Sequence, residues 1–372
     1  MSHRLAPWLL ALGCACSDSE APSRSETELH RSASSSQSAA LSASAPRVAM
    51  LLTRPGASHT RLVLQPVGGH ALAAPVASVS HLPDAESRGV LLPNGARVAL
   101  VTDVRAGRDA SFGAALFRLD VGGAATELVD SVVHATRPAV VDAEHVAVER
   151  GTAGPEPSAA QIAQGELRAD ALWLDLVNVS TGATRTVHQF VGYTTHLCGV
   201  LERELLVYRV RFGHADLVAI DVDHGSVRAL VDSIPGMARD FSVDASTRSL
   251  VYANHDDGGW FVERLGLDSG VRSRLATGVT MQALPSVWLD GGVLLNDGRG
   301  AVTTGGGLPL SRPLGDGFDQ VRAWSPDGAL AALLHHVPGA FSRPFAVDVN
   351  ENRVLPVAVS PGHRVDVVGV LP

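Results

Sequence analysis

Residues 322–333 read RAWSPDGALAAL, and the order of residue types in this stretch decides the fold class. An apolar residue leads into a polar turn centred on Asp327 and Gly328, and a second apolar run follows the turn. Tight turns of Asp, Asn or Gly between alternating apolar residues are typical of β-hairpins. The same outline recurs at five further turn positions: Asn94, Asp142, Glu202, Asp244 and Asp290.

A second series of hairpin patterns runs out of phase with the first. Its turn positions are Gly69, Gly122, Gly182, Gly225, Gly270 and Asn352. Successive turns of the first series lie 37 to 60 residues apart. Two hairpins in each period of about 45 residues make four strands, which is the blade of a β-propeller. A pair of β-sandwiches is the rival interpretation, but that architecture has no fixed period.

The stretch Trp324-Ser325-Pro326-Asp327-Gly328 resembles the WSPDG motif of TolB-like, WD40-like bacterial β-propellers. In that family the motif forms the turn between the inner strand of a blade and its second strand. We therefore expect an all-β fold with one propeller of four-stranded antiparallel blades, seven in number, with six as the alternative. Strands within residues 48–81 would begin the first blade, and the C-terminal run HRVDVVGVL would complete it and close the ring. Such closure removes exposed sheet edges.

The N-terminal residues predict an address outside the cytoplasm. Residues 1–13 match the plan of an export signal, with basic residues before a short apolar run. The end of this run, ALGC at 11–14, resembles a bacterial lipobox, which implies cleavage before Cys14 and a lipid on its thiol. Cys16 is the alternative acceptor, and secretion without a lipid is the alternative route. Ala15 is not the aspartate that retains lipoproteins at the inner membrane, so the resemblance implies the outer membrane, facing the periplasm or the cell surface.

Composition divides the remaining chain and excludes several kinds of chemistry. Residues 14–46 are rich in Ser and Ala and predict a flexible tether, which leaves 47–372 for the propeller. The net charge of −8 argues against a nucleic-acid partner. All 30 basic residues other than histidine are arginine, so no Schiff-base or Walker lysine exists. His335 and His336 are adjacent and would point to opposite faces of a strand, and we expect no metal and no cofactor.

Residues that begin the inner strands of a propeller face its central channel. Here those positions are Arg137, His196, Asp240, Gln282 and Arg322. This polar set predicts a site for an anionic ligand or a peptide terminus, although the same side chains could simply satisfy one another in a wet channel. We expect a non-catalytic module that binds an envelope protein or a small ligand, with the lipid as its only attachment to the membrane. The alternatives are a hydrolase or lyase at the channel mouth and a purely structural envelope protein.

Overall fold

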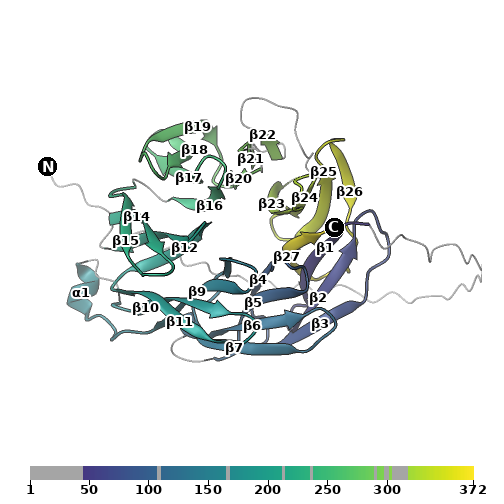
Figure 1. Cartoon of the computed structure of the whole chain (residues 1–372), viewed down its shortest axis with the longest axis horizontal. Helices are drawn as coiled ribbons and strands as arrows, with labels where there is room; N and C mark the ends of the chain where they lie inside the picture. The colour runs from purple at the N-terminus through teal and green to yellow at the C-terminus, as the bar shows by residue number, and fades with distance from the viewer. Residues whose placement is uncertain are drawn as a thin grey trace, which may run out of the picture. The chain divides into compact units, whose positions relative to one another are not determined.

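The computed structural model describes residues 45–106, 110–164, 168–211, 214–234, 238–288, 291–296, 301–303 and 317–372. These residues form antiparallel β-sheets that follow one another around a ring, so the expected all-β propeller arrangement is confirmed (Figure 1). Helical structure is limited in this part of the chain to η1 (Ala110–Phe112) and α1 (Ala159–Ala163). None of the described helices is long and apolar enough to span a bilayer. The predicted signal, the tether up to residue 44 and Cys14 lie outside the described residues.

The two ends of the described chain lie in one sheet. Its strand order is β27 (Arg364–Leu371), β1 (Arg47–Thr53), β2 (His59–Pro66) and β3 (Pro75–Ser80). The last strand pairs with the first over its whole length, from Thr53 opposite Arg364 to Arg47 opposite Leu371. The C-terminal run therefore completes the first sheet as its innermost strand, as the sequence predicted.

An eight-stranded sheet follows. It contains β4 (Ser87–Leu91), β5 (Arg97–Asp103), β6 (Ala114–Asp120), β7 (Ala125–Val132), β8 (Ala139–Val140), β9 (His145–Thr152), β10 (Ala171–Asn178) and β11 (Thr184–Val191). The strands up to β7 connect to the later ones through a single residue pair, Val132 with Arg150. Between β9 and β10 lies an insertion that carries α1, whose first turn is capped by the side chain of Ser158.

Four further sheets complete the described ring. Three of them have four strands and one has three, and the strands of each sheet run in sequence order. They comprise β12 (Thr194–Leu201), β13 (Glu204–Arg211), β14 (His214–Asp221) and β15 (Val227–Val231); β16 (Arg239–Asp244), β17 (Ser249–Asp256), β18 (Gly259–Gly266) and β19 (Arg272–Val279); β20 (Ser286–Val287), β21 (Val293–Asn296) and β22 (Ala301–Thr303); and β23 (Phe318–Trp324), β24 (Leu330–His336), β25 (Arg343–Asp348) and β26 (Arg353–Pro356).

The hairpin turns fall where the two repeat series predicted them. The first series joins the inner two strands of a sheet, as at Glu202 between β12 and β13, and the second joins the outer two, as at Asn352 between β25 and β26. Both residues adopt positive φ, +53° and +48°, as tight hairpins require. At the turn predicted around Gly69, the residue with positive φ is its neighbour Gly68. Asp290 lies outside the described residues.

The WSPDG stretch builds its own turn after β23. The Ser325 backbone N–H donates to the Leu330 carbonyl at 2.8 Å, and the Gly328 N–H donates back to the Ser325 carbonyl at 2.9 Å. The Ser325 hydroxyl also accepts from the Leu330 N–H, at 2.8 Å. Trp324 stacks on Trp288 of the preceding sheet with ring centroids 5.7 Å apart. The motif therefore closes one hairpin and ties two neighbouring sheets together.

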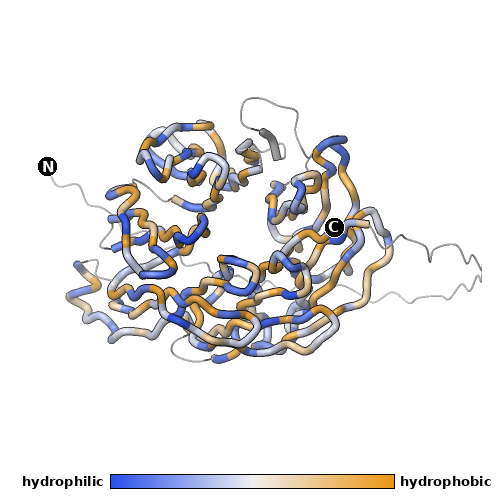
Figure 2. The backbone as a smooth tube through the Cα atoms, viewed as in Figure 1, coloured by the Kyte–Doolittle hydropathy of each residue, from blue (hydrophilic) through white to orange (hydrophobic). Residues whose placement is uncertain are grey.

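The core lies between the sheets rather than inside any one of them. Within the described residues, buried apolar side chains form seven clusters, and each cluster joins two neighbouring sheets or the two halves of the eight-stranded sheet. Hydrophobic stretches recur along the strands of every sheet (Figure 2). Face-to-face packing of this kind holds successive sheets around the ring and leaves the starts of the inner strands facing the centre.

Candidate functional site

A polar pocket of about 670 Å³ lies where the inner strands begin. Arg137 reaches it from just before β8, His196 from β12, Asp240 from β16 and Arg322 from β23. The first and last of these four residues, Arg137 and Arg322, lie more than 180 positions apart in the sequence. Only closure of the ring brings them together. Four of the five residues that the sequence singled out thus line one pocket.

Gln282 is the fifth candidate, and the structure does not place it with the others. It lies in the loop between β19 and β20, where its backbone N–H donates to Thr280 Oγ1 at 3.3 Å and its carbonyl accepts from Asn296 Nδ2 at 3.1 Å. The neighbouring segment, including Leu284 and Ser286, lines the pocket instead. Counting back from the predicted turn placed the start of this inner strand near Gln282. The strand β20 begins later, at Ser286, because the loop before it forms a compact turn.

A buried carboxylate that the sequence reasoning missed organises the two pocket arginines. Asp366, on the closing strand β27, is 4% exposed. Its Oδ1 accepts from Arg137 Nη2 at 2.6 Å and from Arg322 Nη2 at 2.7 Å, while its Oδ2 accepts from the Gly89 backbone N–H at 3.2 Å. Arg137 also donates to the Gly89 carbonyl. One side chain therefore links strands from three sheets at the centre of the ring.

The charge of this cluster is unbalanced. Two guanidinium groups share the single carboxylate of Asp366, which leaves one excess positive charge at the pocket. Arg88 lies 3.9 Å from the same carboxylate but has its own partner in Glu86. The Nε of Arg322 is buried and has no acceptor among the described residues, so this guanidinium keeps donor capacity beyond its bond to Asp366. A basic excess of this kind favours an anionic ligand.

Asp240 contributes the opposite charge to the lining of the same pocket. Its backbone has a φ of +55°, a conformation that Asp and Asn tolerate better than most residues. Arg239 Nε donates to its Oδ2 at 2.8 Å. Burial raises the pKa of the Asp240 carboxyl, and the nearby charges of Arg239 and His196 oppose this rise. The Asp240 carboxyl therefore gains a proton, and loses its negative charge, at a higher pH than an ordinary aspartate does, whereas the arginines stay charged.

Aromatic side chains form part of the wall of this pocket. The Phe241 ring lies 5.7 Å from the His196 ring and 5.4 Å from the Tyr208 ring, centroid to centroid. Cys198 lines the same wall, and burial raises the pKa of its thiol well above the usual value. A thiol held in its protonated form is a poor nucleophile, which favours the sequence interpretation of Cys198 as a packing residue.

Asp366 was the main omission of the sequence analysis. The one available signal was a carboxylate in the middle of the apolar run HRVDVVGVL, since an acidic residue inside a buried strand needs a partner. Gln320, Arg239 and Ser286 also line the pocket beside the predicted residues. Among the residues that the structure describes, no group of three histidine, cysteine or acidic side chains is placed to hold a metal ion.

Comparison with known proteins shows the fold. No family model and no curated protein sequence matches this chain. Solved structures do match it. TolB from Acinetobacter baumannii has a TM-score of 0.50 at 12% identity, over 87% of this chain and 66% of TolB. An oligogalacturonate lyase in complex with manganese has a TM-score of 0.54 at 12% identity, over 80% of this chain and 83% of the lyase.

A prolyl endopeptidase matches over 86% of this chain and 50% of its own length, with a TM-score of 0.53 at 15% identity. This chain thus spans about two thirds of TolB and half of the endopeptidase. The named neighbours thus include a lyase and an endopeptidase as well as TolB. At such low identity the likeness extends to the TolB-like propeller fold and leaves the function to the site itself.

Proposed function

We propose that the central pocket of this cell-envelope protein is a non-catalytic binding site, which holds an anionic group of a small ligand or partner peptide. The observation that carries the proposal is the sharing of one buried carboxylate, Asp366, by Arg137 and Arg322. Guanidinium groups bind carboxylates through paired charge-assisted hydrogen bonds. The remaining walls of the pocket combine apolar side chains such as Phe241 and Leu284 with polar ones such as Ser242 and Gln320, which suits a small ligand that has both kinds of group.

The ring in this proposal has seven blades, and two observations support the count. The eight-stranded sheet divides into two four-stranded units at the single pair between β7 and β9. The seven apolar clusters of the described residues then fall one between each pair of neighbouring units, with the last between the first unit and the one that carries the WSPDG turn. A ring of seven units needs seven such interfaces.

Sulfate titration tests the proposed anion site. Sulfate is the probe because it stays a dianion between pH 5 and 7, and chloride of equal ionic strength is the reference. Arg137→Gln removes the excess charge and one charge-assisted donor, so the affinity for sulfate, measured by isothermal titration calorimetry, should fall about tenfold or more. Arg248→Gln is the control, because Arg248 pairs with Asp268 at an outer hairpin turn. An equal loss in both variants would show only non-specific screening and would contradict the proposal.

Asp240→Asn should change sulfate affinity in the opposite direction. The amide preserves the shape and tolerates the positive φ of this position, but it removes a negative charge from the pocket that the arginines line. Sulfate should therefore bind the variant more tightly at pH 7. In the native protein, affinity should rise as the pH falls toward the raised pKa of Asp240, and the variant should lack this step. Weaker binding by the variant would contradict this electrostatic role of Asp240.

The stability of this variant provides a check on the same carboxyl. A folded-state pKa above the unfolded value means that the folded protein loses stability as the pH rises through that pKa. The Asn variant, which carries no such charge, should be at least as stable as the native protein at pH 7. Thermal unfolding at pH 5 and pH 7 measures the difference.

Attachment through Cys14 places the module on a membrane in this proposal, and the lipobox-like residues 11–14 support it. Replacement of Cys14 by serine should release the protein from the membrane fraction of a bacterial host, because no thiol would remain at the acceptor position. Cys16→Ser is the matched control and should stay bound. Retention of the Cys14 variant together with release of the Cys16 variant would move the anchor to the second cysteine.

A further inference from the structure

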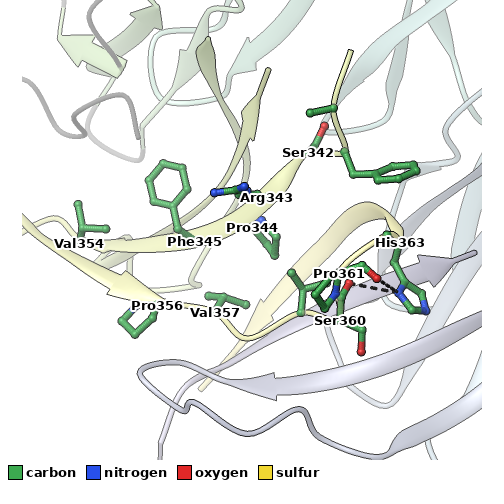
Figure 3. A pocket seen from close by; sticks show the side chains of 14 residues that line it. Ser342, Arg343, Pro344, Phe345, Val354, Pro356, Val357, Ser360, Pro361 and His363 are labelled. Atoms are coloured by element: carbon green, nitrogen blue, oxygen red, sulfur yellow. Dashed lines mark hydrogen bonds between the residues drawn. The ribbon is translucent and has the colours of Figure 1, made fainter. Parts of the chain in front are cut away.

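A second recess, separate from the central pocket, lies along β25 and β26 and the segment that leads to the closing strand. Its volume is about 700 Å³. Figure 3 shows its lining, with Phe345, Val357 and Pro361 among the apolar side chains and Ser342, Arg343 and His363 among the polar ones. Phe341 in its wall is 43% exposed. This apolar groove is large enough for a short acyl or alkyl group.

Ser342 at the start of this groove is bonded to a histidine. Its Oγ lies 2.8 Å from Nδ1 of His336, the last residue of β24. The other ring nitrogen, Nε2, lies 3.1 Å from Oε1 of Gln320. Phe318, which is opposite His336 in the strand register, stacks on the imidazole at 4.8 Å. The ring is thus held on both edges and on one face.

The partners of His336 fix its tautomer. Gln320 Oε1 is an acceptor only, so Nε2 carries the proton and donates to it. Nδ1 then has a free lone pair, and the Ser342 hydroxyl donates to it. Serine, imidazole and an orienting acceptor in this order form the arrangement that activates a hydroxyl for attack on a carbonyl carbon.

The protonation state of His336 suits a general base. Burial lowers the pKa of His336, and the nearby His335 and Arg88 lower it further, so the imidazole is neutral and able to take a proton at pH 7. His335 points to the other face of β24, where it pairs with the buried carboxyl of Asp319 at 2.8 Å. The two adjacent histidines therefore have separate partners.

We propose that Ser342 is the nucleophile of an esterase site, with His336 as its base, Gln320 as the positioning residue, and uncharged esters with a small apolar acyl group as substrates. Ser342 Oγ attacks the ester carbonyl carbon while its proton moves to His336 Nδ1. The C–O bond to the alcohol then breaks, and the leaving alkoxide takes that proton. Water hydrolyses the acyl-serine by the same route in reverse, with His336 again as base. The net reaction consumes one ester and one water and yields one acid and one alcohol.

Arg343 follows Ser342 in the chain and lines the same groove. Its side chain is exposed and forms no ion pair within the described part of the protein. Its guanidinium adds a positive charge to the lining of the groove.

An alkyl fluorophosphonate, which reacts covalently with activated serines, tests the site in the whole protein. Peptide mass spectrometry should locate the adduct on Ser342. Ser342→Ala should abolish the adduct, and His336→Asn should slow its formation at least about 100-fold, as expected for loss of a general base. The matched control is Ser360→Ala, because Ser360 lines the same groove and does not contact His336. Hydrolysis of p-nitrophenyl butyrate should follow the same order, and thermal unfolding identifies any variant that fails to fold.

The pH profile distinguishes a base from a merely structural histidine. The labelling rate of the native protein should be half-maximal below about pH 6.5, the usual pKa of histidine, because the pKa of His336 is lowered. Gln320→Glu has almost the same shape but places a negative charge beside Nε2, so the midpoint should move upward. No adduct on Ser342, unchanged labelling of His336→Asn, or an unmoved midpoint in a folded Gln320→Glu variant would each overturn the proposal.

Discussion

Deletion of residues 363–372 is expected to abolish cooperative folding. The deletion removes β27, whose side chains take part in two apolar clusters, Val367 and Val370 in one and Val368 and Leu371 in the other. Burial of four such side chains contributes on the order of 6–12 kcal/mol, which is comparable with the whole stability of a domain, about 5–15 kcal/mol. Loss of β27 also exposes the edge of β1. Thermal unfolding by circular dichroism and size-exclusion chromatography should show no cooperative transition and aggregated protein.

A synthetic peptide provides the control for this deletion. A peptide of residues 362–372, GHRVDVVGVLP, added during refolding should occupy the vacant strand position by β-augmentation and restore a monomer with a cooperative transition. A peptide of the same composition in scrambled order should fail to do so. If the truncated protein instead unfolds cooperatively near the native midpoint, the packing between the other sheets holds the ring, and the closing strand is dispensable.

Asp366→Ala is expected to lower the free energy of unfolding by about 3 kcal/mol, measured by urea titration. The change leaves Arg322, which is 14% exposed, and Arg137, which is 30% exposed, without their shared carboxylate. Loss of one partner of a buried ion pair costs about 3–5 kcal/mol, and we take the lower end because Arg137 is partly open to solvent. The Gly89 backbone N–H loses its acceptor as well.

Two further measurements give this prediction a sharp test. Asp268→Ala breaks an ion pair of similar geometry to Arg248, but with a carboxylate that is 61% exposed, so its cost should stay below about 1 kcal/mol. Sulfate should restore more stability to the Asp366 variant than to the native protein, because an anion in the pocket replaces the missing charge. A folded Asp366 variant that gains nothing from sulfate would separate the structural role of this carboxylate from anion binding.

The repeat pattern predicted most of the strand order, because turn chemistry and alternation are local properties. Glu202 and Asn352 mark hairpins whatever the rest of the chain does, since each turn depends on the backbone preferences of a few neighbouring residues. The starts of the inner strands were harder to place. Gln282 lies two to four positions from the residues of the neighbouring segment that line the pocket, because the length of a loop is set by how two sheets pack.

The function of the pocket depends on contacts that no local pattern encodes. Arg322 and Asp366 lie on strands of two different sheets and Arg137 lies just before β8 of a third, and the sequence alone does not say that one carboxylate holds both guanidinium groups. The hydrogen bond between Ser342 and His336 likewise depends on a contact that no local pattern encodes. The sequence showed two adjacent histidines that point to opposite faces of a strand, but not that a hydroxyl from the loop before the next strand reaches one of them.

The sequence by itself determined the all-β class, the hairpin turns, the four-stranded unit and the closing role of the C-terminal run, because each follows from residue spacing over a few dozen positions. Only the tertiary structure decided which side chains share a pocket and which charges remain unbalanced there. The physical reason is that ring closure brings β27 beside β1 and places Asp366 among arginines that lie 44 and 229 residues away along the chain. The energies of those contacts depend on burial and on partners from other sheets, and these arise only when the whole ring has formed.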